Sequence, residues 1–407
     1  MLYAITTTAV AIAAGMVLLR PRVMRAPTWR ATITPLASII GSGFLVAGPI
    51  LAHSTGNLAW VAMAGLCAVA YLFGAAIRRN IRFIEPMMDN GNAGNAIVGL
   101  EHTSHFALAF AYFISVAYYL NLFASFLLRG AGVVDEQAVR MISTMTIVSI
   151  GAYGMWRGLR GLEKIEEIAV GVKLSLFSGV IASMAVSGFI ALIGGGFNLS
   201  PLHHTTGWHE IQILLGLVIL VQGFETSRFL GSGYDADERI RTMKYAQWLS
   251  TAFYIVFIFL MTPFFTGKLP AQGGETAVID ILDPLGWYIS PVIIAAALGS
   301  QLSAAVADMN GAGGLLKDST DKRVSLAAGY GLTAVAAVAI TWAANIYEII
   351  VYASKAFVIY YGMQSVLAAI VAWRRGEAQD RRLAALFVFA TLLAAAVLAF
   401  GLPAEGG

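Results

Sequence analysis

The sequence predicts an all-α membrane protein with about twelve membrane-spanning helices. Of its 407 residues, 58% are hydrophobic and only 12% are charged, and the mean hydropathy is +0.75. A chain of this composition is not an ordinary water-soluble globule. Apolar runs of about 20 residues, long enough to cross a hydrocarbon core of about 30 Å, recur along the chain. The placement of the basic residues supports the same helix count independently.

No stretch between the apolar runs is long enough for a separate soluble domain, so we expect a single helical bundle. The expected spans cover residues 1–19, 32–52, 58–77, 106–128, 139–156, 165–195, 211–232, 245–266, 288–312, 325–345, 348–373 and 383–402.

Lysine and arginine gather in every second loop, namely those after the odd-numbered spans. The intervening loops hold only Arg129, Arg140 and Lys268. Because short cytoplasmic loops are enriched in basic residues, this alternation predicts a protein of the plasma (inner) membrane with both termini outside. The small excess of basic residues, with a pI near 8.9, is then explained by the basic cytoplasmic loops and does not indicate nucleic-acid binding.

The first span could instead be a cleaved signal peptide. No basic residue precedes its apolar stretch, however, and its charges follow it, which favours a retained helix. Cys67 is the only cysteine, so an intramolecular disulfide is impossible.

Two expected spans carry flexible or polar residues at mid-depth. The second contains Gly41, Ser42 and Gly43, and the seventh contains the sequence QGFE at 222–225. Each glycine weakens a helix by roughly 1 kcal/mol relative to alanine. The two spans are five helices apart, and broken helices in corresponding positions of two five-helix halves indicate an inverted-repeat secondary transporter.

This pattern predicts an organisation in four parts. An extra helix and a basic loop occupy residues 1–29, and two inverted repeats occupy 30–200 and 201–375. A C-terminal helix occupies 376–407. The second repeat is inverted because each repeat has an odd number of helices, in agreement with the loop charges.

Helix breaks at mid-membrane leave amide and carbonyl groups without intrahelical partners. Free N–H groups near Gly41 to Phe44 would suit a carboxylate, because they lie at the positive end of a half-helix. Free carbonyls near Gln222 to Phe224 would suit an ammonium group, so the two breaks together would hold a zwitterion. The alternative is that the glycines only permit close helix packing, as small residues do throughout membranes.

Three stretches resemble the amino acid, polyamine and organocation (APC) superfamily, which has the LeuT-type fold. They are IGSGFLVAGP in the second span, GFE in the seventh and GLRGLEKIEEIAVGVKL leading into the sixth. The resemblance covers roughly residues 30 to 373 and implies that the first and sixth core helices unwind around the substrate. The matching positions in this sequence are Gly41, Ser42, Gly43, Phe44, Gly223, Phe224 and Glu225.

The chain departs from a typical family member in its peripheral helices, with one before the ten-helix core and one after it. The segment after the sixth core helix also lacks the proline that is common there in amino acid permeases. The fold is therefore better supported than the substrate.

Basic residues inside spans are candidates for function, because ionisable groups are costly there. In several proton-coupled or sodium-independent members, a lysine in the fifth core helix occupies the place of a sodium ion, and Lys173 matches it. A buried lysine can gain and lose a proton near neutral pH, which would couple transport to protons. Ser300 and Ser303 leave sodium open, and Lys173 could also snorkel to the surface. Arg228 is interpreted as part of a structural ion pair.

The function predicted from these features is secondary transport of a small amino acid or related zwitterion, with coupling through Lys173 and Ser303. Glu225 could bind a proton or a cationic substrate, or it could brace the unwound backbone. A nucleobase or heterocycle transporter of the same fold and a sodium-coupled symporter remain alternatives. The histidines form no recognised metal-ligand pattern and no phosphate-binding loop occurs, so we expect neither an enzyme nor a cofactor. The expected partners are a small-molecule substrate, a proton and the lipid bilayer, with the oligomeric state open.

Overall fold

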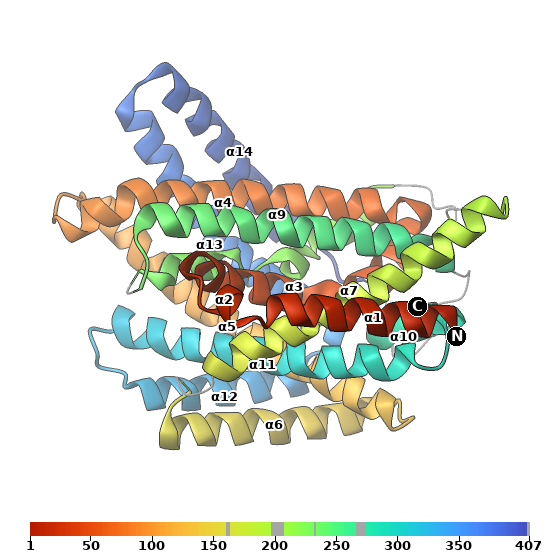
Figure 1. The fold of residues 1–407 in the computed structure, drawn as a ribbon. Helices are drawn as coiled ribbons and strands as arrows, with labels where there is room; N and C mark the ends of the chain where they lie inside the picture. The colour runs from red at the N-terminus through yellow and green to blue at the C-terminus, as the bar shows by residue number, and fades with distance from the viewer. Residues whose placement is uncertain (160–162, 197–206, 232, 266–273, 405–407) are drawn as a thin grey trace.

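Most of the long helices run side by side along one direction, and α14 is inclined to them (Figure 1). The computed structural model describes residues 1–159, 163–196, 207–231, 233–265 and 274–404. Within these ranges the regular elements are all helical. The prediction of an all-α membrane protein is therefore confirmed.

Eleven of the long elements are continuous helices, and a twelfth is broken. The continuous ones are α1 (Leu2–Leu18), α3 (Pro27–Thr55), α4 (Ala59–Asp89), α5 (Asn95–Gly130), α6 (Glu136–Arg157), α7 (Glu163–Ile193), α9 (Ala236–Met261), α11 (Ile289–Ser319), α12 (Leu326–Ala343), α13 (Ile346–Arg375) and α14 (Ala378–Phe400). The broken one consists of α8 (Trp208–Leu215), η3 (Val218–Val221) and η4 (Phe224–Leu230).

Nine apolar segments in the described residues are long enough to cross a membrane, and one of them, Pro27–Asp89, contains both α3 and α4. The shorter apolar helix α1 and the broken helix complete the set. The helix count from the sequence therefore agrees with the structure. The expected repeat boundary at residue 200 lies outside the described residues.

Both ends of the described chain lie at one end of the bundle, on the right in Figure 1. The arginine-rich starts and ends of α2 (Pro21–Met24), α4, α9 and α14 lie at the other end, which we call the basic end. The helices thus alternate in direction as the loop charges require. Which side of a membrane the basic end faces stays a prediction.

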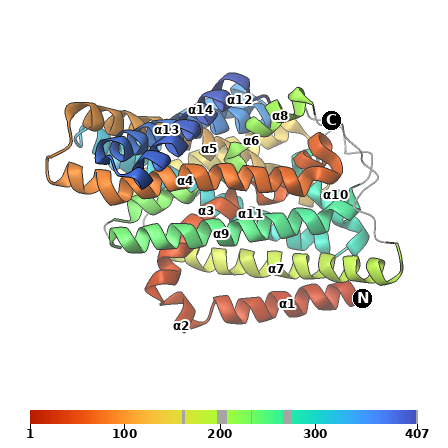
Figure 2. The same ribbon diagram turned by 90° about the horizontal axis from the view of Figure 1, so that it is seen from above.

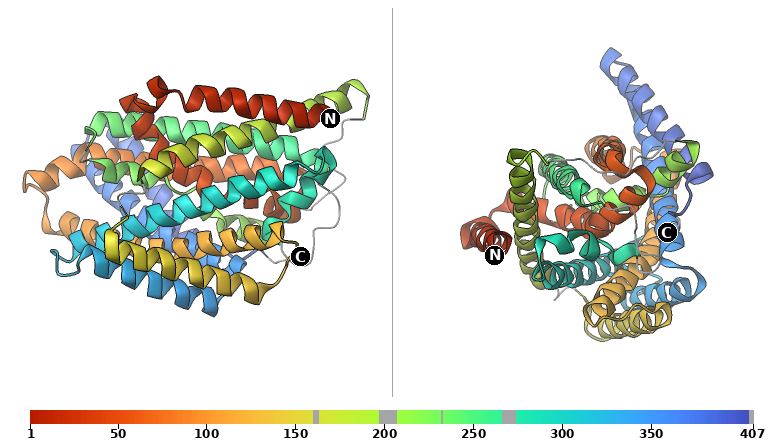
Figure 3. Two further views of the ribbon diagram at one scale, coloured as in Figure 1. Left: turned by 60° about the horizontal axis from the view of Figure 1, so that its bottom comes forward. Right: turned by 90° about the vertical axis from the view of Figure 1, so that its right-hand side faces the viewer.

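The extra helices α1 and α14 cover different flanks of the bundle (Figures 2 and 3). Small residues let α1 approach α7 closely, since a Cβ on Gly179 would lie 2.5 Å from the Thr7 carbonyl oxygen. The hydroxyls of Thr7 and Ser183 form a hydrogen bond of 2.5 Å across this contact. On the other flank α14 packs on α13.

The prediction of a helix break in the second span is wrong. α3 is helical without interruption through Gly41 to Phe44, and it contacts both η3 and η4. The physical reason is packing: a Cβ on Gly43 would lie 2.7 Å from the Leu220 Cα atom of η3. The glycines of α3 therefore allow two backbones to touch, which is the alternative role weighed from the sequence.

Substituting Gly43 tests this contact. We expect Gly43→Ala to lower the free energy of unfolding by about 1–3 kcal/mol, because the new methyl group overlaps the Leu220 Cα atom as well as the Leu220 side chain, and the backbone atom cannot swing away. Gly99→Ala is the matched control, since a Cβ at Gly99 in α5 meets nothing within 4 Å. That change should leave stability unchanged or raise it by up to about 1 kcal/mol.

The measurement is unfolding of the detergent-solubilised protein in an SDS titration. Equal effects of the two substitutions would contradict the close approach of α3 and η3.

Candidate functional site

The helix break at mid-membrane is centred on Gly223. After η3 the chain becomes extended at Gln222, with a ψ of 167°, and Gly223 adopts a left-handed φ of 119° before η4 begins. A residue with a Cβ rarely adopts this backbone conformation, so glycine is required here. The interruption expected at Gln222 to Glu225 is present.

Side chains from three elements satisfy backbone groups that the break releases. The N–H of Ile219 donates to Ser354 Oγ of α13 at 3.0 Å, and the Leu220 carbonyl accepts from Tyr254 Oη of α9 at 2.5 Å. The N–H of Gly223 donates to Glu225 Oε2 at 2.9 Å. Unpaired backbone groups are costly in a membrane, so these partners are what allow the chain to unwind.

Glu225 is completely buried, and only one of its carboxylate oxygens is bonded. Oε2 accepts from the Gly223 N–H and from Tyr361 Oη at 2.8 Å. Oε1 has no hydrogen-bond partner within the described part of the chain. The carboxylate therefore braces the break with one oxygen, as one of the two expected roles required, while the other oxygen has no partner among the described residues.

A second buried polar atom without a partner in the described residues adjoins the same glycine. It is Ser38 Oγ of α3, which lies 2.5 Å from the place a Cβ of Gly223 would take. Burying a polar group without a hydrogen bond costs free energy, so this pair of atoms marks a candidate place for a polar ligand. The sequence did not single out Ser38, because its value depends on the packing of α3 against the break.

Aromatic rings surround these polar atoms. The Tyr361 ring stacks on Phe224 and on Phe73, with centroid separations of 5.0 and 5.3 Å. Gln222 Nε2 donates to Tyr119 Oη at 2.5 Å. An apolar wall with a few convergent polar groups is typical of a small-molecule site.

Phe44, a candidate from the second span, lies in a different aromatic group. Its ring is 4.3 Å from Phe257, 4.6 Å from Phe177 and 5.3 Å from Tyr254, measured between centroids. Because α3 is helical from Gly41 to Phe44, backbone amides freed by unwinding are not available there as carboxylate ligands. Among the expected site residues, the structure gathers Gln222 to Glu225 around the break.

Lys173 of α7 is buried and does not reach the surface. Its Nζ donates to the Ala37 carbonyl of α3 at 2.8 Å and to Ser300 Oγ of α11 at 3.3 Å. The hydroxyl of Ser303 donates to the Ser300 carbonyl at 3.1 Å, within its own helix. Lys173 therefore joins α3 to α11 through Ser300, one of the two serines considered from the sequence.

A cavity of about 520 Å³ leads inward from the basic end between α3, η4 and α11. Its lining runs from the exposed Arg30 and Asp318 to the buried Asp308 and Ala37, and it includes Thr226 beside Glu225. Ser115 Oγ donates to the Asp308 carboxylate. The cavity thus reaches the residues next to both unpartnered atoms, Ser38 Oγ and Glu225 Oε1.

Arg228 ties η4 to its neighbours through buried ion pairs. Its guanidinium contacts Glu101 of α5 at 2.6 Å and Glu85 of α4 at 3.4 Å. Arg239 of α9 contacts Glu85 at 2.6 Å and donates to the Arg228 carbonyl at 2.7 Å. The expected structural ion pair is present, although its carboxylates come from distant helices and not from the adjacent Asp235 or Asp237.

Breaking the Arg228–Glu101 pair should destabilise the bundle. We expect Glu101→Gln to cost about 3 kcal/mol of unfolding free energy, because it leaves a buried arginine under-compensated. Asp237→Asn, which breaks the exposed Arg82–Asp237 pair, should cost less than about 1 kcal/mol. An SDS titration in detergent measures the unfolding free energy of both variants. Equal losses of unfolding free energy would contradict a larger contribution from the buried pair.

Comparisons with known proteins agree with this architecture. A profile of APC superfamily transporters matches residues 21–401. A protein of Aquifex aeolicus (strain VF5), described as uncharacterized, is 38% identical over 362 residues, which is 88% of each chain.

Two solved structures share the arrangement of helices. One is a substrate-bound, outward-open Na⁺-coupled sialic acid symporter, with a TM-score of 0.52, 13% identity and coverage of 99% of this chain and 98% of that one. The other is MHP1, a nucleobase-cation-symport-1 family transporter, closed with bromovinylhydantoin bound, with a TM-score of 0.51, 12% identity and coverage of 91% and 92%. At these identities the likeness concerns the fold alone. Since the profile covers nearly the whole chain, the protein belongs to the APC superfamily and is a secondary transporter with the LeuT-type fold.

Proposed function

We propose that this transporter carries a small amino acid or a related zwitterion by alternating access, with a proton as the coupling ion. The observation that carries the proposal is the pair of buried atoms at the break, Glu225 Oε1 and Ser38 Oγ. A carboxylate oxygen is a strong acceptor for an ammonium group, and a hydroxyl can donate to a substrate carboxylate. α3 then contributes its Ser38 side chain to the site instead of free amides at Gly41 to Phe44.

The access route supports alternating access. The cavity from the basic end reaches Thr226, directly after Glu225. Further from the basic end along α3 and along the broken helix, Gly43 packs against Leu220 backbone to backbone. This state is open toward the basic end and closed on the other side of the site, and the opposite state requires α3 and η3 to separate.

Uptake into proteoliposomes tests the substrate class. Pooled labelled amino acids would be supplied with a proton gradient, a sodium gradient or neither, and we expect accumulation with the proton gradient. Glu225→Gln should raise the KM by about 10- to 100-fold, because a charge-assisted hydrogen bond contributes about 1.5–3 kcal/mol. Asp89→Asn, which changes an exposed carboxylate, is the control.

An unchanged KM in Glu225→Gln would reject the ammonium site. A second candidate function, transport of a nucleobase or other heterocycle, is favoured by the stacked rings of Phe224, Tyr361 and Phe73. Uptake of labelled uracil or hydantoin without amino acid uptake would select it. Accumulation only with the sodium gradient would select a sodium-coupled symporter.

Lys173 is the proposed coupling residue. A proton lost from its ammonium group would weaken the bonds to Ala37 and Ser300 and release α3 from α11. Lys173→Ala should abolish gradient-driven accumulation while equilibrium substrate binding remains measurable. Lys173→Gln, which keeps a hydrogen-bond donor but cannot titrate, should behave in the same way.

Lys355→Ala is the matched control, since Lys355 is a half-buried lysine in another spanning helix, α13. We expect it to accumulate substrate normally. Normal proton-driven accumulation in Lys173→Gln would contradict the coupling role.

A further inference from the structure

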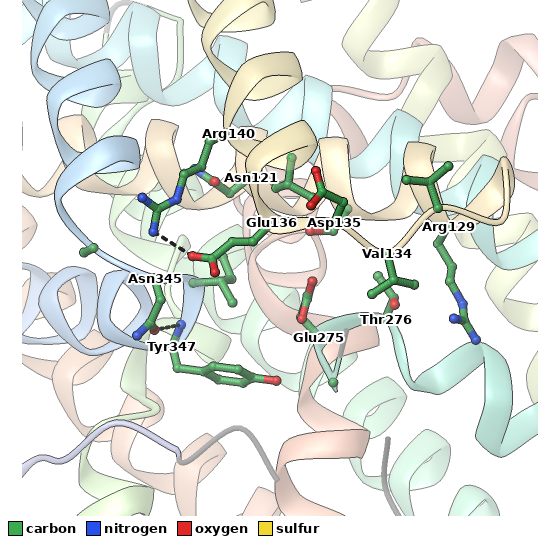
Figure 4. Close-up of a pocket in the computed structure, with 16 residues that line it drawn as sticks. Asn121, Arg129, Val134, Asp135, Glu136, Arg140, Glu275, Thr276, Asn345 and Tyr347 are labelled. Carbon is green, nitrogen blue, oxygen red and sulfur yellow. Dashed lines mark hydrogen bonds and ion pairs between the residues drawn. The ribbon is translucent and has the colours of Figure 1, made fainter. Parts of the chain in front are cut away.

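A second cavity, of about 370 Å³, lies at the end of the bundle opposite the basic end (Figure 4). We call it the opposite-end cavity. Its walls come from the last turns of α5, the start of α6, η6 (Gly274–Thr276) and the residues that lead into α13. It shares no lining residue with the cavity at the basic end.

The arginines of this cavity already have carboxylate partners. Arg140 pairs with Glu136 at 2.6 Å, and Arg129 pairs with Asp280. The Asp135 carboxylate accepts from the Ala138 N–H at 2.7 Å and caps α6. The positive charges are therefore neutralised locally, and Asp135 adds a negative one.

Glu275 is the exception among the charged residues of the cavity. Its side chain is only 9% exposed, yet it makes no hydrogen bond or ion pair within the described residues. In Figure 4 its carboxylate points into the cavity, toward the loop that carries Asp135. Its carboxylate oxygens are not among the fully buried atoms without a partner, so they are accessible from the cavity and give its wall a negative charge that no described cation pairs with.

The surroundings of Glu275 favour an organic cation over a metal ion. No group of three or more His, Cys, Asp or Glu side chains in the described residues is close enough to hold a metal. The cavity instead combines amide and hydroxyl groups, from Asn121 and Ser125, with the apolar Val134 and Val139. Its volume falls in the range of small-molecule sites.

We infer that the opposite-end cavity is a second binding site, which takes a small molecule with a primary ammonium group held by Glu275. The ammonium group donates to the Glu275 carboxylate, and the aliphatic part of the ligand packs on the valine side chains. The site is separate from the break at Gly223, and the inference does not depend on which solute the central site carries.

Titration calorimetry of the full-length protein in detergent with n-butylammonium chloride tests this site. We expect saturable binding to the parent protein, and none of 1-butanol, which has the same carbon chain and no charge. Glu275→Gln should weaken the Kd at least tenfold. Asp283→Asn, which neutralises an exposed carboxylate at the same end, should leave the Kd unchanged.

Two further variants locate the binding. Val134→Trp fills the cavity from its exposed rim without altering any charge and should also weaken the Kd at least tenfold. Glu225→Gln removes the proposed ammonium acceptor of the central site, so the n-butylammonium binding that remains in this variant is expected to come from the opposite-end cavity. The inference is overturned if the parent protein shows no saturable binding, if Glu275→Gln binds as tightly as the parent, or if binding is lost only in Glu225→Gln.

Discussion

The requirement that backbone groups be hydrogen-bonded inside a membrane governs the centre of this protein. The chain unwinds between η3 and η4, and it can do so only because Ser354, Tyr254 and Glu225 bond to the released groups. Tyr254 belongs to α9 and Ser354 to α13, so their bonds to the released backbone groups hold both helices against the break. The same requirement explains why Glu225 is buried: its carboxylate replaces the hydrogen bond that a continuous helix would provide for Gly223.

The two glycine-containing segments look alike in sequence and behave differently in the structure. In the seventh span, glutamine and glutamate flank the glycine and supply bonds for an unwound chain, so polarity at mid-depth correctly predicted the break. In α3 the neighbours of Gly41 and Gly43 are mostly apolar, and the helix continues. A glycine permits both unwinding and close packing, and only the position of Leu220 against Gly43 decides between them.

The sequence predicted what depends on composition and local pattern: the helix count, the alternating direction and the break at 222–225. It could not predict partners that meet only through the fold. Glu101 lies 127 positions from Arg228, and Ser38 becomes a candidate site residue only because it packs against Gly223. Glu275 gave no signal because it lies in a polar stretch of sequence, and its place in a cavity arises from α5, α6 and α13 together.

Two contacts hold α3 and η4 against neighbouring helices, and their chemistry differs. Arg228 holds η4 through carboxylates, and breaking that contact exposes full charges at both ends. Lys173 holds α3 through the Ala37 carbonyl and contacts Ser300 Oγ of α11, and loss of one proton would weaken both of these bonds. In the proposed transport cycle α3 separates from η3 at Gly43, and release at Lys173 would remove a second contact of α3, the one with α11. In the proposed mechanism the lysine contact is the one that responds to a proton, while the arginine ion pairs keep η4 anchored.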